Sequence, residues 1–434
     1  MKSTPPAPAP TSRQIASEVV RRVLVDDAFA AAALSAEFER HPQISGRQRA
    51  AATDLVYGAL RAARYLDGRL VRLDAGAAID PPTRAVLWVA GYELAFRPAS
   101  PAHAVVDAAV DAAKAYHVPS GRFVNALLRK LATDLTKDPA PSLPEAFVAG
   151  APRWLRRALD RAMGAGEAAR FLAAGPWPPP LGLRVRRGER DEWITRLREA
   201  IPDATFEPSP VSGRAIRCGS GGGDPQQWPG VVEGDLVVQE EGSQAVAEAL
   251  PLAAGDRVLD ACAGRGNKTL ALVDRLRTID VAAPGVVDAA DLHAPKLVRL
   301  RDEAARLGVT VGQTLALDAS VGLGGMPSGQ HDRVLIDAPC SGTGTLRRRP
   351  EIVLRRVETD LLSLQAQQRA IVRTVAAAVR PGGTLLYAVC SVLAEECEQV
   401  LDGLEGFTLR ELRRLLPQND GCDGYALARL ERTS

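Results

Sequence analysis

From Leu236 onward, short apolar runs alternate with stretches of helical periodicity, and this alternation limits the possible folds more than any other feature of the sequence. The runs are RVLDACA (257–263), GVVDAAD (285–291), TLALDA (314–319), RVLIDAP (333–339) and TLLYAVC (384–390). Such alternation is typical of a mostly parallel, doubly wound sheet, in which ligands bind beyond the carboxyl ends of the strands. We therefore predict a Rossmann-like domain over residues 236–434, with its functional residues where strands end.

The preceding part of the chain divides into two further regions. Residues 12–135 carry apolar residues at spacings of three and four and contain no β-rich run, which predicts an all-helical domain. Pro and polar residues at 136–146 indicate a linker. Residues 147–235 combine an expected strand, PLGLRVR (180–186), with helical segments, and so predict a small α/β domain. Three domains suit a chain of 434 residues.

Composition limits the expected cellular location of the protein but does not identify its binding partner. The 54 Lys and Arg residues nearly balance 52 Asp and Glu residues, so the net charge of +2 does not by itself indicate a nucleic-acid partner. No apolar run reaches the length of a membrane span, and the Pro-rich start lacks the apolar stretch of a secretory signal. We expect a cytoplasmic protein without a membrane partner, and a monomer.

The cysteines point to single thiols rather than to a metal site or disulfides. No two of the six form a CxxC pair, so neither zinc nor a redox couple is predicted. The six are Cys218, Cys262, Cys340, Cys390, Cys397 and Cys422.

A glycine turn follows the first run of the predicted sheet. Gly264 and Gly266 allow the backbone to approach a ligand closely, and the start of the next helix offers free N–H groups. The spacing fits neither a P-loop nor a dinucleotide fingerprint, which needs a glycine where Thr269 stands. Asp291 ends the next run and is placed to accept hydrogen bonds from ribose hydroxyls. Asp318 could accept a hydrogen bond from an adenine amino group. The alternative is a plain strand-to-helix turn with capping Asp residues.

Two cysteines end adjacent strands of the predicted sheet. Asp337 and Cys340 lie at the end of RVLIDAP, and Cys390 ends TLLYAVC. Neighbouring strands lie about 4.8 Å apart, so we expect two thiols and a carboxylate to converge at one edge. The alternative is that each thiol is a small buried hydrophobic group, which is the interpretation we keep for Cys397 and Cys422.

These motifs resemble those of a known family. DACAGRGNKT (260–269), DAPCSGTGTLRRRPE (337–351) and YAVCS (387–391) are similar to the successive motifs of the NOL1/NOP2/Sun family of RNA cytosine-5 methyltransferases. The segment VVQEEGSQAVAEAL (237–250) resembles the family's element before its first motif. The helical region, with LVYGALR (55–61) and RFVNALLRKL (122–131), is similar to the RNA-binding domain of NusB. The resemblance covers nearly the whole chain after residue 12.

The resemblance implies methylation of carbon 5 of a cytosine, with S-adenosyl-L-methionine as the cofactor. That carbon is a poor nucleophile until a thiolate adds at carbon 6. By resemblance, Cys390 is this nucleophile, and Cys340 assists removal of the proton or release of the product from the enzyme. Asp337 would hydrogen-bond the cytosine ring. Asp291 and Asp318 would hold the ribose and adenine. The remaining cofactor contacts implied are Asp260, Cys262, Ala263, Gly264, Arg265, Gly266, Lys268 and Asp337.

Two residues depart from the family's first motif. Arg265 stands where the family usually has Pro, and Asn267 replaces the second of its paired glycines. Both departures concern the turn implied to bind the cofactor, so they bear on the affinity for the cofactor.

Arginine clusters are the predicted RNA contacts. Arg347, Arg348 and Arg349 directly follow the Cys340 motif, and the planar donor fork of arginine suits phosphates and bases. RVRRGER (184–190) offers a second basic patch. The alternative for both clusters is a solvated charged face. Bases of paired RNA are poorly accessible, so the target cytosine should lie in a loop or be flipped out.

The substrate remains open among three possibilities. The NusB-like region joined to this core implies ribosomal RNA, specifically 16S rRNA. A transfer-RNA cytosine-5 methyltransferase would carry the same catalytic motifs. A non-catalytic RNA-binding assembly or antitermination factor would explain the NusB-like region and the altered glycine motif, but the retention of Cys340 and Cys390 argues against it.

Overall fold

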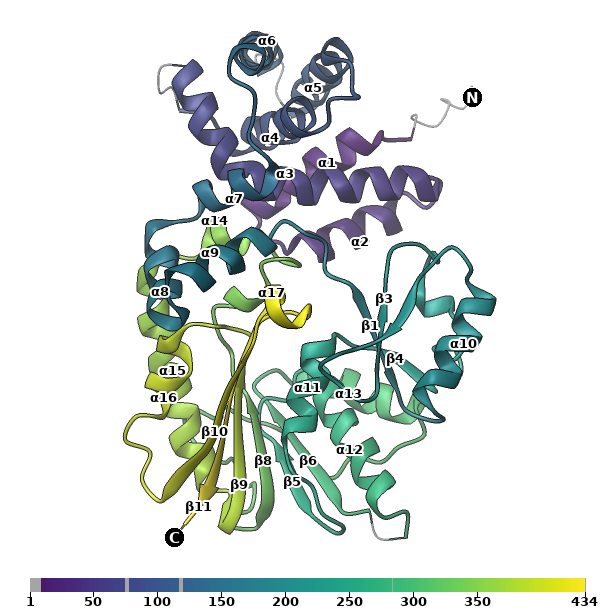
Figure 1. Cartoon of the computed structure of the whole chain (residues 1–434), viewed down its shortest axis with the longest axis vertical. Helices are drawn as coiled ribbons and strands as arrows, with labels where there is room; N and C mark the ends of the chain where they lie inside the picture. The colour runs from purple at the N-terminus through teal and green to yellow at the C-terminus, as the bar shows by residue number, and fades with distance from the viewer. Residues whose placement is uncertain (1–8, 75–77, 117–119, 283, 434) are drawn as a thin grey trace, which may run out of the picture. The chain divides into compact units, whose positions relative to one another are not determined.

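A computed structural model of the chain describes residues 9–433 except 75–77, 117–119 and 283. The chain divides into two compact units (Figure 1). The first, here the helical unit, comprises the residues up to Arg153 with Ala169–Trp177 and Leu346–Arg355. The second, here the sheet unit, comprises Trp154–Ala168, Pro178–Thr345 and the residues from Arg356 onward.

The helical unit confirms the predicted all-helical architecture. Its α-helices are α1 (Ser12–Val25), α2 (Ala30–Arg40), α3 (Gly46–Leu73), α4 (Pro81–Phe96), α5 (Ala102–Tyr116), α6 (Ser120–Lys137), α7 (Leu143–Gly150) and α14 (Ile352–Arg355). Local chemistry sets several starts: Thr11 and Ser45 form capping boxes at α1 and α3, and Asp80 caps α4. One apolar core, with Leu66, Leu87 and other fully buried side chains, holds the helices together.

The predicted linker is shorter than its composition suggested. Helix α6 continues to Lys137, and α7 begins at Leu143, inside the stretch assigned to the linker. The physical reason is a capping box between Ser142 and Glu145, with a proline in the first turn, where its missing N–H costs nothing. Proline therefore starts a helix here instead of interrupting one.

The segment Leu346–Arg355 packs within the helical unit although it follows the Cys340 motif in sequence. Leu354 packs against the helical core. The buried carboxylate of Glu351 accepts a hydrogen bond from the Ala30 amide at 3.2 Å, and Arg355 donates to the carbonyl of Val23 at 2.8 Å. The helical unit thus includes a segment that lies almost 200 residues after its N-terminal helices in the sequence.

The sheet unit contains the predicted Rossmann-like sheet, in the order β10-β11-β9-β8-β5-β6-β7 (Figure 1). The five predicted runs form its parallel strands, and two antiparallel strands that the alternation did not reveal extend one edge. The strands are β5 (Arg257–Asp260), β6 (Val286–Asp291), β7 (Thr314–Ala316), β8 (His331–Asp337), β9 (Val379–Val389), β10 (Phe407–Leu415) and β11 (Tyr425–Arg432).

Alternate residues of the strands bury opposite faces of the sheet. Leu259, Val334 and Ile336 belong to one core, whereas Val258 and Leu335 belong to the other. Helices α15 and α16 cover the first face, and α11 and α12 cover the second (Figure 1). The helices of this unit are α8 (Arg153–Met163), α9 (Ala165–Ala174, shared with the helical unit), α10 (Arg190–Ala200), α11 (Glu241–Ala249), α12 (Asn267–Ile279), α13 (Ala294–Arg306), α15 (Glu358–Ala376), α16 (Glu398–Leu401) and α17 (Pro417–Asp420).

A second, smaller sheet precedes the parallel one, as the small α/β region predicted. Its antiparallel strands lie in the order β2-β3-β1-β4. They are β1 (Leu181–Val185), β2 (Phe206–Pro208), β3 (Ala215–Cys218) and β4 (Leu236–Val238). Trp193 and Leu197 of α10 pack on this sheet together with Trp228.

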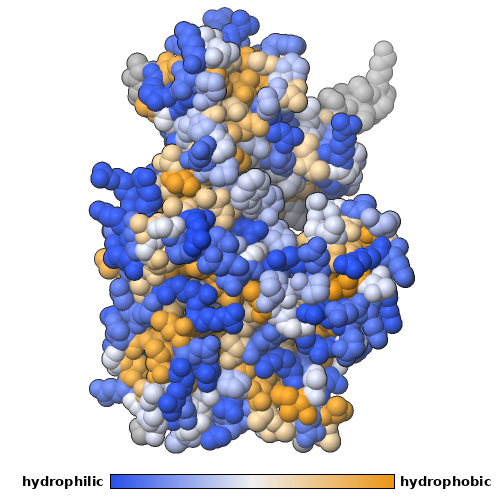
Figure 2. All heavy atoms as spheres, in the orientation of Figure 1, coloured by the Kyte–Doolittle hydropathy of each residue, from blue (hydrophilic) through white to orange (hydrophobic). Residues whose placement is uncertain are grey.

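The visible surface is predominantly hydrophilic, with apolar side chains in separate patches (Figure 2). Among the residues that the structure describes, no helix combines the length and the apolar character needed to cross a bilayer.

Candidate active site

The two cysteine motifs meet at one edge of the parallel sheet. Strands β8 and β9 are hydrogen-bonded neighbours, with Asp337 opposite Ala388. The chain therefore carries Cys340 and Cys390 away from adjacent strand ends, and their Sγ atoms lie 3.3 Å apart. Both side chains are half-buried, so they combine a low-dielectric setting with access from outside. The expected convergence of the two thiols is present.

A buried carboxylate ties the loops that carry these thiols together. Glu396 is fully buried and accepts hydrogen bonds from the Ser341 amide at 2.7 Å and from the Ser341 hydroxyl. Gln368 donates to Glu396 at 3.2 Å and to the carbonyl of Pro339 at 2.8 Å. Residues on both sides of Cys340 are thus anchored to the segment that follows Cys390.

A backbone contact joins the same two loops directly. The Gly344 amide donates to the carbonyl of Cys390 at 3.0 Å, and the Gly344 carbonyl accepts from Gly424 at 2.8 Å. A Cβ atom at Gly344 would lie 2.0 Å from the Gly424 carbonyl oxygen. Only glycine allows this close approach.

Lys268 and Asp337 form a partly buried ion pair beside the thiols, with Nζ and Oδ2 at 2.7 Å. Burial opposes the positive charge, but attraction and hydrogen bonding to Asp337 outweigh it, so the pKa of Lys268 is raised. Negative charge on Cys390 acts in the same direction. Lys268 therefore places a cation where a thiolate would form.

A cavity of about 250 Å³ opens beside this pair. Five residues predicted to contact a cofactor line it together: Cys262, Gly264, Asp291, Asp318 and Asp337. The carboxylate of Asp291 is held by the amides of Gly264 at 2.9 Å and His293 at 2.8 Å. Asp318 is exposed, and its hydrogen bonds from Ser320 lower the pKa of its carboxyl group.

The other predicted cofactor residues do not line this cavity. Asp260 lies behind it, fully buried, with Oδ2 accepting from the Thr269 hydroxyl at 2.7 Å. Desolvation raises the pKa of Asp260 to about 7, although the Thr269 hydrogen bond opposes the shift. The four remaining residues are Ala263, which is buried, Arg265, which is exposed, Gly266, and Lys268, which pairs with Asp337.

The glycine turn has a specific conformational requirement at Gly266. This residue adopts φ 91° immediately before α12, and a Cβ atom there would lie 2.5 Å from Leu300 Cγ. Asn267, where the resembling family has glycine, is the first residue of α12. The substituted position therefore needs no left-handed backbone.

The three arginines predicted to bind RNA all lie in the segment that packs in the helical unit. Arg347 is buried and donates to the Trp177 carbonyl at 3.3 Å, and Arg348 is partly buried. Arg349 is exposed, with its guanidinium 5.3 Å from the centre of the Phe29 ring. RNA contact by these residues stays a prediction.

The second predicted basic patch is wrong for two of its arginines. Arg184 and Arg186 are 5% and 8% exposed, and both bond to Asp274. They point inward because β1 packs against α11 and α12, so they do not form a solvated face. Cys397 and Cys422, by contrast, are buried members of apolar cores, as predicted.

Several residues of the site were not among those predicted from the sequence motifs. Glu396, Ser341 and Gln368 form the buried network, and Tyr425 presents its ring 5.7 Å from Lys268. The cavity is also lined by apolar side chains outside the motifs, namely Leu292, Leu317 and Ile371. Position after the Cys390 motif is the only sequence signal for Glu396.

Two family models match this chain. Residues 247–420 match the model described as 16S rRNA methyltransferase RsmB/F, and residues 10–133 match the NusB family. A ribosomal RNA small subunit methyltransferase B from Pseudomonas syringae pv. tomato is 33% identical over 419 residues, covering 88% of this chain and 89% of that protein. The protein of the same name from Erwinia tasmaniensis is 32% identical over 415 residues, with coverage of 89% and 91%.

Solved structures share the fold. The crystal structure of PH0851 superposes with a TM-score of 0.81 at 23% identity, covering 98% of this chain and 100% of that chain. NSun6 from Pyrococcus horikoshii, solved with SFG, has a TM-score of 0.57 at 17% identity, covering 65% and 98%.

Proposed function

The chain belongs to the RsmB/F family of 16S rRNA methyltransferases, and we propose that it methylates carbon 5 of a cytosine in 16S ribosomal RNA through a covalent bond to Cys390. Its relatives carry the name ribosomal RNA small subunit methyltransferase B, which supports a ribosomal substrate. A NusB-like domain, matched at residues 10–133, supports an RNA partner.

The thiol pair is the observation that carries the cytosine-5 chemistry. The hydrogen bond between Cys340 and Cys390, together with burial, raises the pKa of the Cys340 thiol well above its ordinary value. We therefore assign the proton of the pair to Cys340, which donates to the sulfur of Cys390. Lys268, held cationic by Asp337, favours negative charge on the same sulfur. This division of roles supports Cys390 as the nucleophile and Cys340 as the group that handles the proton.

The cavity lined by Asp291 and Asp337 fits S-adenosylmethionine by the chemistry of its lining. Asp291 is oriented by two backbone amides, yet each carboxylate oxygen has a second lone pair for a ribose hydroxyl. Leu292, Leu317 and Ile371 offer apolar walls for an adenine ring, and the turn at Gly264 allows close backbone approach. When bound, S-adenosylmethionine supplies a methyl group on a sulfonium.

The protein's own residues would act in two stages. The Cys390 thiolate adds to carbon 6 of the cytosine, and the electron pair of the C5–C6 double bond makes carbon 5 nucleophilic. With Cys390 held as a thioether, the negative neighbour that raises the pKa of Cys340 is gone. Once carbon 5 carries the methyl group, Cys340 can release its own proton to solvent and, as a thiolate, remove the proton from carbon 5. The electron pair of that C–H bond re-forms the C5–C6 double bond. The bond from Cys390 to carbon 6 breaks, and its electron pair returns to the sulfur.

Methylation mapping tests this proposal. The protein is incubated with labelled S-adenosylmethionine and unmodified small-subunit RNA, and modified bases are located. We expect label at carbon 5 of a cytosine in 16S rRNA. Label found only in transfer RNA would reject the ribosomal substrate, and label on another atom would reject the cysteine-addition chemistry.

A further inference from the structure

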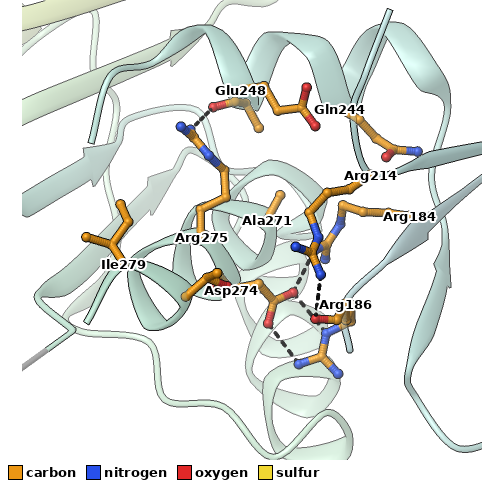
Figure 3. Close-up of a pocket in the computed structure, with 11 residues that line it drawn as sticks. Arg184, Arg186, Arg214, Gln244, Glu248, Ala271, Asp274, Arg275 and Ile279 are labelled. Carbon is orange, nitrogen blue, oxygen red and sulfur yellow. Dashed lines mark hydrogen bonds and ion pairs between the residues drawn. The ribbon is translucent and has the colours of Figure 1, made fainter. Parts of the chain in front are cut away.

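A second cavity, separate from the thiol site, lies between β1 and the helices α11 and α12 (Figure 3). Its volume is about 200 Å³, and it shares no lining residue with the cavity lined by Asp291 and Asp337. The charged side chains of its lining are Arg184, Arg186, Arg214, Arg275, Glu248 and Asp274.

Positive charge exceeds negative charge in this lining, with four guanidinium groups facing two carboxylates. Asp274 accepts from Arg184 at 2.6 Å and from Arg186 at 2.9 Å, so one carboxylate serves two cations. Glu248 accepts from the Ser212 hydroxyl at 2.6 Å. Both carboxylates therefore accept hydrogen bonds from neighbouring side chains, but their two negative charges do not neutralise the four positive charges of the arginines.

Arg214 and Arg275 bond to backbone carbonyls instead of carboxylates. Arg214 donates through Nε to Val185 at 2.9 Å, and Arg275 donates to Leu250 at 2.9 Å. Within the described part of the chain, neither forms an ion pair. Carbonyls satisfy hydrogen bonds but leave the net charge uncompensated.

Burial makes this excess charge costly. Desolvation lowers the pKa of Arg184, and the nearby charges of Arg186 and Arg214 lower it further, against the attraction of Asp274. Burial also lowers the pKa of Arg275, although Glu248 partly opposes this shift. A partly buried cation without a charged partner is stabilised when an anion enters beside it.

We propose that this cavity binds a phosphate group at the guanidinium group of Arg214. The planar fork of arginine matches the oxygens of a tetrahedral oxyanion, and charge-assisted bonds of this kind are the strong ones. Figure 3 shows Arg214 directed into the cavity toward Asp274 and Arg186. Ile279, 46% exposed, and Thr278, also exposed, lie at the rim, so the site is open to a ligand from outside.

Calorimetric titration of the full-length protein with inorganic phosphate, at constant ionic strength set with chloride, tests the proposal. We expect saturable binding to one site without cofactor or RNA, so the result does not depend on the methylation chemistry. Arg214→Gln removes one guanidinium fork and should weaken phosphate binding about tenfold or more. Arg413→Gln, a matched change of an exposed arginine on β10, should leave it unchanged.

A second variant keeps the test decisive if Arg214→Gln unfolds. Thr278→Glu adds a carboxylate at the exposed rim; the only side-chain bond described for Thr278, to the carbonyl of Asp274 on its own helix, is not needed for the fold. It should abolish phosphate binding at an unchanged melting temperature. Phosphate binding of equal strength in the wild type and in Thr278→Glu, or no binding to the wild type, would overturn the proposal.

Competition identifies the source of the phosphate group. A short oligoribonucleotide with only internal phosphodiesters that displaces inorganic phosphate supports an RNA backbone as the ligand. Displacement only by a 5′-phosphorylated nucleotide supports a free phosphate monoester instead.

Discussion

The ammonium group of Lys268 lies 2.7 Å from Oδ2 of Asp337 and 5.7 Å from the ring centre of Tyr425. The pair links the helix after the glycine turn to the end of β8, the strand that leads to Cys340. Because the pKa of Lys268 is raised, the lysine stays cationic throughout the neutral range. A fixed cation beside Cys390 lowers the cost of forming a thiolate there.

Replacing this cation should change the pH dependence of methylation. In Lys268→Met, we expect the single-turnover rate at pH 7 to fall at least about tenfold, because the thiolate of Cys390 loses its positive neighbour. The rate should recover partly as the pH rises, and Lys268→Arg should keep the wild-type profile. A pH profile unchanged in Lys268→Met would show that the lysine acts only through packing.

The two cysteines should give opposite results in a trapping experiment. In Cys340→Ala, the proton on carbon 5 is removed slowly, so a covalent RNA adduct should accumulate and survive denaturing electrophoresis. In Cys390→Ala, no adduct should form and methylation should cease. An adduct that persists in Cys390→Ala would reverse the roles assigned to the two thiols.

The buried carboxylate of Glu396 should matter for both stability and catalysis. Glu396→Gln keeps the shape but turns an NH₂ group toward the donors of Ser341 or Gln368, which should cost about 1–3 kcal/mol in the free energy of unfolding. Urea denaturation measures this loss, and adduct formation should slow because the Cys340 loop is held less firmly. Glu431→Gln is the control, since its ion pair with Arg410 is exposed on both sides and contributes little. Equal losses in both variants would contradict a special role for Glu396.

Much of the site was predictable because it depends on local pattern. Strand ends are marked by apolar runs, and parallel strands place their carboxyl ends at one edge, so the approach of Cys340 to Cys390 followed from order alone. The glycine turn could also be located from the sequence. Whether Asn267 can replace a glycine at this turn could not be predicted. The structure shows that the strict requirement for glycine is at Gly266, where Leu300 leaves no room for a side chain.

What could not be predicted depends on contacts between distant segments. Charge clusters looked alike in sequence, yet Arg184 and Arg186 are buried against Asp274, some 90 residues away, whereas Arg349 is exposed. The network around Glu396 likewise joins segments that share no motif. No periodicity reports such pairings, because they are set by tertiary packing.

Anchoring of the segment Leu346–Arg355 in the helical unit gives a prediction about protease sensitivity. Glu351→Ala removes the acceptor for the Ala30 amide and leaves a small void, so the segment should open more often. Limited digestion with trypsin should then cut after Arg347 or Arg348 several times faster than in the wild type. Glu358→Ala, which removes an exposed ion pair with Arg157, should digest like the wild type. Equal digestion of both variants would show that Glu351 does not hold the segment.

The buried carboxyl group of Asp260 should make folding stability depend on pH. Desolvation raises its pKa to about 7 from an ordinary value of 3.8, so the folded protein binds a proton that the unfolded chain has lost between these values. The contribution of this bound proton to the free energy of unfolding is fully present below pH 3.8 and is lost as the pH rises to about 7. Asp260→Asn stays neutral and should accept the Thr269 hydrogen bond through its remaining oxygen. The free energy of unfolding of Asp260→Asn, relative to the wild type, should therefore increase from pH 5 to pH 8 in urea denaturation. A difference that does not change over this range would mean that the carboxyl group is already ionised in the folded protein at pH 5.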